Sequence, residues 1–259
     1  MKKNILKKII ITALSIIYTS VLVGCSNTND KSNDEILIGY DNTFVPMGFL
    51  DEKGNTVGFD VDLANEVGKR LNMNIKFQSI DWSMKEAELN SGNIDAIWNG
   101  YTLTEERKSK VAYTDPYLDN KQIIVTLKDS NINSKSDLKN KTIGTQSDSA
   151  GMEAILKDTS FTDSINNKGP VLYDTFDNAF RDLEIGRIDA LVADEVLARY
   201  YISQKDKDIY SILSDNFGTE VFVVGFKKDN TELRDKVNTA LNEIKEDNAF
   251  DNIYSKWFK

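Results

Sequence analysis

The sequence predicts an α/β protein made of two similar halves. Short apolar runs alternate with segments whose apolar residues recur at helical spacing, and this alternation continues to the C-terminus. Strands that alternate with helices favour a largely parallel sheet covered by helices. The pattern also repeats once, because NIDAI at 93–97 reads like RIDAL at 187–191. A single echo of this kind indicates two related α/β units and not a solenoid.

The first half opens with the apolar run 36–40, which suits a strand that is covered on both faces. Residues 51–55 contain Gly54-Asn55 and predict a hairpin turn. Residues 60–71 have apolar side chains at helical spacing, with acidic residues first and basic residues last, as the helix dipole favours. The other elements predicted here are a strand at 74–77, a helix at 82–90 that ends near Gly92, and a buried strand at 94–98.

The second half follows the same alternation, with the polar loop QSDSAG at 146–151 leading into a helix. From residue 123 onward the predicted strands are 123–125, 142–145, 188–193 and 221–226. The predicted helices are 136–138, 152–156, 177–184, 195–202, 232–244 and 250–258.

Residues 1–24 are predicted to be a lipoprotein signal peptide that is removed from the mature chain. Lysines precede an apolar run at 9–23, and the sole cysteine, Cys25, follows at its end. The alternative is an N-terminal transmembrane anchor with an incidental cysteine, but the run is short for a membrane span. We therefore expect Cys25 to carry lipid and to hold the protein on the outer face of the cytoplasmic membrane. Residues 25–34 are polar and read as a flexible tether.

Composition excludes several classes of function. The chain has no histidine, so Ser-His-Asp triads and histidine-ligated metal sites are ruled out. One cysteine allows neither an internal disulfide nor a thiolate cluster. The formal charge is −9, and loss of the four leader lysines takes it to −13, which makes nucleic acid an unsuitable partner. No metal or cofactor is expected.

The segment 99–107, NGYTLTEER, reads as a turn that leads into a helix, and it is the strongest candidate for a ligand site. Thr104 is a suitable N-cap, and Glu105 and Glu106 fall in the first helical turn, where the helix dipole favours acids. Arg107 is disfavoured there unless an anion lies between its guanidinium and the helix start, and a carboxylate fits that description. The alternative is a surface arginine paired with Glu105 or Glu106.

The pattern Gly-x-Thr-x-Thr-x-x-Arg at 100–107 resembles the amino-acid-gripping loop of the bacterial extracellular solute-binding proteins of family 3. These are the substrate-capturing subunits of polar amino acid ABC transporters. The segments DNTFVP at 41–46, VGFDVDL at 57–63 and YTDPY at 113–117 also resemble the family, in the family's order. The resemblance covers the whole chain after the leader.

This resemblance implies a two-lobed, periplasmic-binding-protein-like fold of type II, in which the first lobe is discontinuous. Lobe 1 would comprise residues 35–118 and 222–259, and lobe 2 residues 119–221. Two crossovers, near 118–122 and 218–223, would form a hinge, and the ligand would lie in the cleft that the hinge closes.

The resemblance also implies which residues hold the two charged ends of an amino acid. Arg107 would bind the α-carboxylate with the Thr102 hydroxyl, and Asp194 would bind the α-ammonium. The backbone groups expected to assist are the Gly100 carbonyl at the ammonium and the N–H groups of Ser149 and Ala150 at the carboxylate. Two other readings remain open: Asp194 could cap the helix 195–202, and Thr102 could satisfy local backbone only.

Phe44 and Trp82 would sandwich the ligand side chain, with Asp41 and Gln146 at its far end. Asn99 stands next to this loop, at a position that Ser or Ala often fills in the family. Phe44 and Trp82 could instead be ordinary core aromatics. An acidic group beside two aromatics suits glutamine, a basic side chain or the polar end of cystine.

The function implied is that of a lipid-anchored amino acid receptor, which catalyses no reaction and works with the permease and ATPase subunits of an ABC importer. One alternative is an enzyme on the same fold, such as a cyclohexadienyl dehydratase, with Asp41 as the general acid. Another is the sensing domain of a receptor, which would need a second membrane span and a signalling domain.

Overall fold

The computed structural model describes residues 34–205 and 208–258, and in this part of the chain one mixed sheet of nine strands forms the framework. The predicted signal peptide, Cys25 and all but the last residue of the predicted tether lie outside the described residues. The strands of the nine-stranded sheet are β1 (Glu35–Tyr40), β5 (Asn74–Ser79), β6 (Ala96–Thr102), β7 (Val111–Tyr113), β8 (Leu118–Leu127), β9 (Ile143–Gln146), β10 (Val171–Tyr173), β11 (Ala190–Asp194) and β12 (Tyr210–Lys227). A small antiparallel sheet contains β2 (Thr43–Phe44), β3 (Gly48–Leu50) and β4 (Thr56–Val57).

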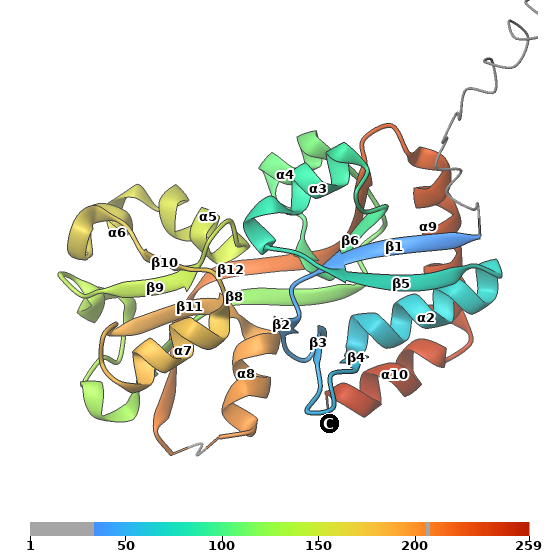
Figure 1. The fold of residues 1–259 in the computed structure, drawn as a ribbon. Helices are drawn as coiled ribbons and strands as arrows, with labels where there is room; N and C mark the ends of the chain where they lie inside the picture. The colour runs from blue at the N-terminus through green and yellow to red at the C-terminus, as the bar shows by residue number, and fades with distance from the viewer. Residues whose placement is uncertain (1–33, 206–207, 259) are drawn as a thin grey trace, which may run out of the picture. The chain divides into compact units, whose positions relative to one another are not determined.

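The sheet order is β10-β9-β11-β8-β12-β6-β1-β5, which places the two long strands β8 and β12 in the middle. On one side β5, β1 and β6 are parallel, and on the other side β10, β9 and β11 are parallel. We call these the first and the second half. β8 and β12 pair with each other antiparallel, and each also borders one half in antiparallel fashion. Figure 1 shows both strands passing from one half into the other, which is the two-lobed α/β arrangement with two crossovers.

Helices cover both faces of each half (Figure 1). In the first half they are α2 (Phe59–Leu71), α3 (Lys85–Ser91), α4 (Glu105–Lys110), α9 (Thr231–Glu246) and α10 (Ala249–Trp257), preceded at α3 by the 3-10 turn η1 (Trp82–Met84). In the second half they are α5 (Ala150–Lys157), α6 (Thr159–Ser164), α7 (Phe176–Glu184) and α8 (Glu195–Ser203), with the 3-10 turns η2 (Lys128–Ser130), η3 (Lys135–Leu138) and η4 (Asn166–Lys168).

The core of the first half forms where α2 meets α9. The α2 residues Leu63 and Val67 and the α9 residues Ala240 and Ile244 are all fully or nearly fully buried in one hydrophobic cluster. Their spacing of four residues places them on one face of each helix, as the apolar pattern predicts. At the C-terminus the Trp257 indole donates a hydrogen bond to Asp62 of α2 at 2.8 Å, which fixes α10 to the same core.

Three elements differ from the sequence-based expectation. Residues 99–102, predicted as a turn, extend β6, because Tyr101 and Thr102 pair with Val223 and Phe222 of β12. β12 begins at Tyr210, well before the predicted strand 221–226, because residues 210–220 also pair with β8. The sheet is parallel only within each half, because both crossover strands run antiparallel to their neighbours.

Among the described residues no helix is long and apolar enough to cross a membrane. The same part of the chain contains no group of acidic or cysteine side chains arranged to hold a metal ion.

Candidate ligand-binding site

A small cavity lies where β2, β6 and α4 face α5, α7 and β11. Its volume is about 10 Å³, far below the roughly 300–1,000 Å³ of most ligand pockets. The residues that line it are Phe44, Trp82, Gly100, Thr102, Arg107, Gln146, Ser149, Ala150, Phe176 and Asp194. The fold therefore brings together every predicted ligand residue except Asp41 and Asn99, and it adds Phe176. Entry of an amino acid requires the two halves to part, because the walls are closely apposed.

Arg107 forms the cationic end of this cavity. Its side chain is 3% exposed, and its NH1 and NH2 groups donate hydrogen bonds to the carbonyl oxygens of Thr102 at 3.1 Å and Asp148 at 2.8 Å. The guanidinium lies 4.7 Å from the centre of the Tyr101 ring, which holds its plane in place. Its Nε lies 3.5 Å from Glu153 and 3.8 Å from Glu86. A guanidinium has five N–H donors, so donors of NH1 and NH2 remain for an anion in the cavity.

The surface-pairing alternative for Arg107 is wrong. Glu105 and Glu106 form ion pairs with Lys108 and Lys110, on the exposed face of α4. Thr104 caps the helix as predicted, because its hydroxyl accepts a hydrogen bond from the Arg107 N–H at 3.2 Å. The cap fixes the first turn of α4 and so aims the Arg107 side chain inward.

The start of α5 faces Arg107 from the second half. Ser149 is the N-cap: its hydroxyl accepts from the Met152 N–H at 3.1 Å and donates to the Gln146 carbonyl at 2.7 Å. The Ser149 N–H is engaged weakly, with the Gln146 carbonyl at 3.4 Å. Ala150 opens the helix, and the N-terminal end of a helix carries partial positive charge. Arg107 and this helix end together make one side of the cavity suitable for a carboxylate.

Asp194 forms the anionic end. It is the last residue of β11 and is 4% exposed, and its Oδ1 accepts hydrogen bonds from Asn120 at 2.6 Å and from Gln122 at 2.9 Å, both on β8. Although Asp194 stands at the N-cap position of α8, its side chain makes no capping bond, so the capping alternative is wrong. Burial, and then the nearby charge of Glu220, raise the pKa of Asp194 well above its usual range. A cation beside this carboxylate would favour its ionised form.

Three aromatic side chains form the remaining walls. Phe44 comes from β2, Trp82 from the 3-10 turn before α3, and Phe176 from the first turn of α7. The Phe44 and Phe176 rings are 5.9 Å apart at an angle of 56°. Phe44 and Trp82 belong to hydrophobic clusters as well as to the cavity wall, so the core role and the lining role are held by the same rings.

Gly100 brings the backbone of β6 close to the cavity. Its φ of 59° is a left-handed conformation, and a Cβ there would lie 2.7 Å from the Phe44 ring. The Gly100 N–H donates to the Asp60 carboxyl at 2.7 Å, and the Tyr117 hydroxyl donates to the same oxygen at 2.9 Å. Burial raises the pKa of Asp60 to about 7, against the opposing effect of these two bonds.

The Thr102 hydroxyl is not limited to local backbone. It donates a hydrogen bond at 2.9 Å to Glu220, which lies on the crossover strand β12. Thr102 therefore links the cavity wall to a carboxylate that the motif analysis did not select.

Comparisons with known proteins identify the family of the chain. The profile of the bacterial extracellular solute-binding proteins, family 3, matches residues 36–259. The chain belongs to this family. A probable histidine-binding protein of Neisseria gonorrhoeae is 32% identical over 221 residues, which cover 83% of this chain and 80% of that protein.

Two solved structures resemble this solute-binding protein over almost its whole folded part. An ABC uptake transporter substrate-binding protein from Streptococcus pneumoniae with bound histidine has a TM-score of 0.85 and 41% identity, and the match covers 88% of this chain and 94% of that one. An ancestral arginine-binding protein bound to arginine has a TM-score of 0.81 and 37% identity, with 87% and 99% covered. Family and two-lobed fold are thus confirmed, and these relatives are named as binding proteins and not as enzymes.

In this solute-binding protein Asp41 and Asn99 stand behind the cavity wall. Asp41 accepts hydrogen bonds from the Thr43 backbone at 2.9 Å, the Thr43 hydroxyl at 2.7 Å and the Gln146 amide at 2.7 Å. Burial raises the pKa of Asp41 against these bonds. Asn99 accepts from the Asp41 N–H at 3.0 Å and donates to the Gly48 carbonyl at 3.3 Å. Asp41 therefore acts on the cavity through Gln146, and Asn99 holds the loop that carries Asp41.

Hydrogen bonds join the two halves of this solute-binding protein across the cavity. The Asp148 carbonyl accepts from Arg107 and also from Lys85 at 2.9 Å. Lys85 is 2% exposed, and its burial, followed by the charge of Arg107, lowers its pKa to about 8. The Gln146–Asp41 bond is a further link. These contacts hold the closed arrangement in which the cavity is small.

Sequence reasoning missed Phe176, Lys85 and Glu220. Phe176 follows a capping threonine and looks like any apolar residue of an amphipathic helix. Lys85 lies in a helix with many charged residues, where exposure is the usual expectation. Glu220 directly precedes the apolar run 221–226, and a polar residue at the end of a buried strand was the one available signal.

Proposed function

We propose that this solute-binding protein captures one free polar amino acid between its two halves and delivers it to the permease of an ABC importer. The observation that carries the proposal is a closed cavity in the described part of the chain whose walls contain both Arg107 and Asp194. A guanidinium and a carboxylate in one cavity match the carboxylate and the ammonium of an amino acid zwitterion. The relatives named for histidine and arginine support the same class of ligand.

In this proposal the residue roles follow the charges. Arg107, Thr102 and the start of α5 at Ser149 and Ala150 bind the α-carboxylate, for which the Thr102 hydroxyl turns from Glu220 to the ligand. Asp194 with the Gly100 carbonyl binds the α-ammonium. The ligand side chain lies among the rings of Phe44, Trp82 and Phe176 and points toward Gln146, with Asp41 and Asn99 behind it.

The side-chain end favours a planar or cationic group. Aromatic faces attract cations, and Asp41 adds negative character behind the Gln146 amide. We therefore infer a basic amino acid first, with glutamine and cystine as the other members of the class.

The working cycle we propose is closure of lobe 2, residues 119–221, on lobe 1, residues 35–118 and 222–259. Hinge closure around a ligand is established for periplasmic binding proteins as a class. The closed form would then dock on permease subunits coupled to an ATPase. Removal of residues 1–24 and lipid on Cys25 would keep the protein on the outer face of the cytoplasmic membrane, with 25–34 as the tether.

A thermal-shift panel over the common amino acids tests the proposal. At a ligand concentration near 100 times Kd, binding stabilises a protein by about 2.7 kcal/mol, which corresponds to roughly 5–10 °C in Tm for a domain of this size. We expect basic amino acids, glutamine or cystine to give such a shift, with micromolar affinity in calorimetry. If no amino acid raises the Tm, the proposal fails.

The same panel separates binding from catalysis. Prephenate and arogenate, the substrates of the dehydratase alternative, are incubated with the protein and the mixture is analysed for products. We expect both compounds to be recovered unchanged, and steady product formation would place the enzyme first.

A further inference from the structure

We propose that Glu220 is the second carboxylate of the ammonium subsite, so that the cationic nitrogen of the ligand is held by Asp194 and Glu220 together. This inference rests on the proposed function and adds a residue that the family motifs do not supply here.

The two carboxylates share the same donors. The Asn120 amide nitrogen lies 2.6 Å from Asp194 Oδ1 and 2.7 Å from Glu220 Oε1. The Gln122 amide nitrogen lies 2.9 Å and 2.7 Å from the same two oxygens. Both oxygens are therefore within reach of one small cation, and an ammonium group has three N–H donors to offer them.

The amide side chains that hold this pair are left partly unsatisfied. Asn120 and Gln122 are 3% and 1% exposed, and in the described part of the chain their buried oxygens, Oδ1 and Oε1, have no hydrogen-bond partner. A buried acceptor without a hydrogen-bond partner lowers the stability of the folded protein. Both amides thus point their nitrogens toward the carboxylates, although this orientation leaves their oxygens unpaired and lowers stability. With the nitrogens in this orientation, the two carboxylates are held side by side.

Two neighbouring carboxylates in a buried site repel each other. The Asn120 and Gln122 amides donate to both carboxylates, but an amide carries no net charge to balance them. The raised pKa of Asp194, caused by burial and by the charge of Glu220, agrees with that geometry. A binding site can contain charges that lower the stability of the free protein when the ligand supplies the opposite charge. A cationic nitrogen between Asp194 and Glu220 would relieve the repulsion.

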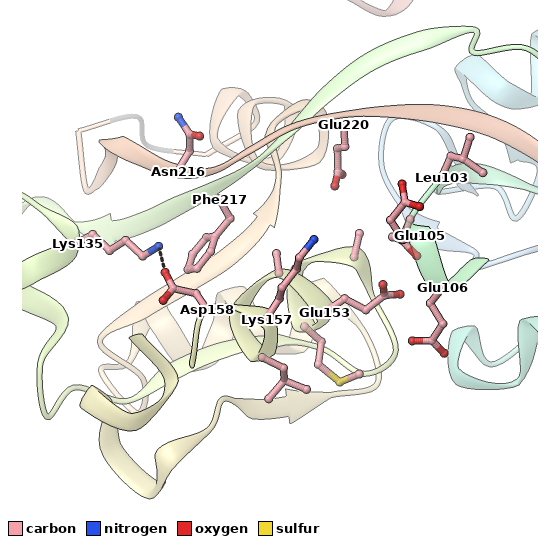
Figure 2. Close-up of a pocket in the computed structure, with 15 residues that line it drawn as sticks. Leu103, Glu105, Glu106, Lys135, Glu153, Lys157, Asp158, Asn216, Phe217 and Glu220 are labelled. Atoms are coloured by element: carbon pink, nitrogen blue, oxygen red, sulfur yellow. Dashed lines mark hydrogen bonds and ion pairs between the residues drawn. The ribbon is translucent and has the colours of Figure 1, made fainter. Parts of the chain in front are cut away.

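Glu220 also connects this subsite to the crossover strands. Asn120 and Gln122 are on β8, Glu220 is on β12, and the Thr102 hydroxyl on β6 donates to Glu220 at 2.9 Å. Figure 2 shows the Glu220 side chain pointing from β12 into a larger cavity, which Glu105, Glu106 and Glu153 also line. Lys135 and Lys157 line this larger cavity too, and it shares Ala150 with the walls of the ligand cavity. Glu220 reaches the ligand cavity through Thr102, which lines it.

The test compares Glu220→Gln with the unchanged protein by calorimetry. The ligands are L-arginine, L-histidine and L-glutamine, each paired with the analogue that lacks the α-ammonium: guanidinopentanoate, imidazolepropionate and glutaramate. The glutamine side chain of the Glu220→Gln variant retains the shape of Glu220 and one acceptor oxygen, but it removes the negative charge. Because a hydrogen bond to a charged group contributes about 1.5–3 kcal/mol, we expect the amino acids that bind to weaken roughly 10- to 100-fold.

The analogues are measured by thermal shift at millimolar concentration. Each analogue should raise the Tm of Glu220→Gln and of the unchanged protein by the same amount. Glu105→Gln, on the wall of the same larger cavity but without contact to Asn120 or Gln122, is the matched control and should leave all affinities unchanged. Glu220→Asp serves as a second variant if Glu220→Gln does not fold, and it should retain part of the affinity.

Two results would overturn the role of Glu220. One is an affinity of Glu220→Gln for the amino acids within twofold of the unchanged protein. The other is an equal loss for the amino acids and their analogues, which would indicate a purely structural side chain. If the unchanged protein binds none of the common amino acids in the panel, the proposed function fails first, and that outcome is read from the unchanged protein alone.

Discussion

Asp60 supports the ligand cavity without lining it. Its carboxyl accepts the Gly100 N–H and the Tyr117 hydroxyl on the same oxygen, so it fixes the backbone where β6 passes the cavity. The pKa of this buried carboxyl is raised from 3.8 to about 7. Between these two values the folded protein keeps a proton that the unfolded chain has lost.

This proton predicts a pH dependence of stability. The contribution of Asp60 is fully present below pH 3.8 and is lost as pH rises through about 7, with a slope of up to about 1.4 kcal/mol per pH unit. Asp60→Asn should remove this slope. Urea unfolding of both proteins at several pH values between 4.5 and 7.5, about the window the two pKa values bound, measures the difference in unfolding free energy. Parallel pH profiles would contradict the assignment.

At the residue scale, the family resemblance indicated Arg107 and Asp194, and the structure places both in the wall of the cavity. The residues that the sequence analysis missed have partners that are distant in the chain. Lys85 acquires its role through the Asp148 carbonyl, 63 residues away, and Glu220 through Thr102, 118 residues away. Such partners arise only when β8 and β12 bring the halves together, which no local pattern encodes.

Among the elements, β6 shows how one glycine shapes a strand. Gly100 interrupts the regular pairing of β6 with β12, where the register shifts between Val223 and Gly225. Its left-handed backbone explains why the segment looked like a turn in the sequence. The backbone turns locally while the flanking residues stay paired.

Gly100→Ala and Gly54→Ala form a matched pair of variants. Both glycines have positive φ, 59° and 80°, but a Cβ at Gly54 would meet open space, whereas at Gly100 it would meet Phe44 at 2.7 Å. We expect Gly54→Ala to lose about 1–2 kcal/mol from left-handed strain alone. Gly100→Ala should lose more and should also bind ligand more weakly.

Urea unfolding and calorimetry separate these two effects. Equal losses of unfolding free energy in the two variants, with unchanged affinity, would show that Phe44 yields easily and that the close approach at Gly100 has no functional weight.

Element types were predictable because the apolar periodicities are strong. The helix predicted at 177–184 is α7 at Phe176–Glu184, and the one at 195–202 is α8 at Glu195–Ser203. The first part of β12 was not predictable, because its polar residues acquire strand structure only from pairing with β8. Local sequence also does not determine whether neighbouring strands are parallel or antiparallel. That depends on how β8 and β12 cross between the two halves.

For the whole molecule, the leader predicts membrane attachment. Cys25→Ala should abolish lipid addition, so that the protein appears in the medium or stays unprocessed in the membrane. Fractionation of cells with an immunoblot distinguishes these forms by size and location. A variant that is processed and membrane-bound like the original would contradict the lipid anchor.

The halves of the folded part meet through few hydrogen bonds around the cavity, chiefly those of Arg107, Lys85 and Gln146. A closed form held this sparingly can open at modest cost, and a ligand that binds both halves favours closure by its differential affinity for the closed state. Arg107 belongs to the first half and Asp194 to the second, so each half would hold one charged end of the ligand.

Calorimetry on Arg107→Ala and Asp194→Ala tests whether these two side chains hold the charged ends of the ligand. Lys108→Ala, on the exposed face of α4, is the control. Truncating one partner of a buried charged contact costs about 2–5 kcal/mol, so both variants should bind every amino acid ligand at least tens-fold more weakly, while Lys108→Ala binds normally. Asp41→Ala and Gln146→Ala should instead change which amino acid is preferred. If Arg107→Ala binds the best ligand as tightly as the unchanged protein, the carboxylate is not held there and the account is wrong.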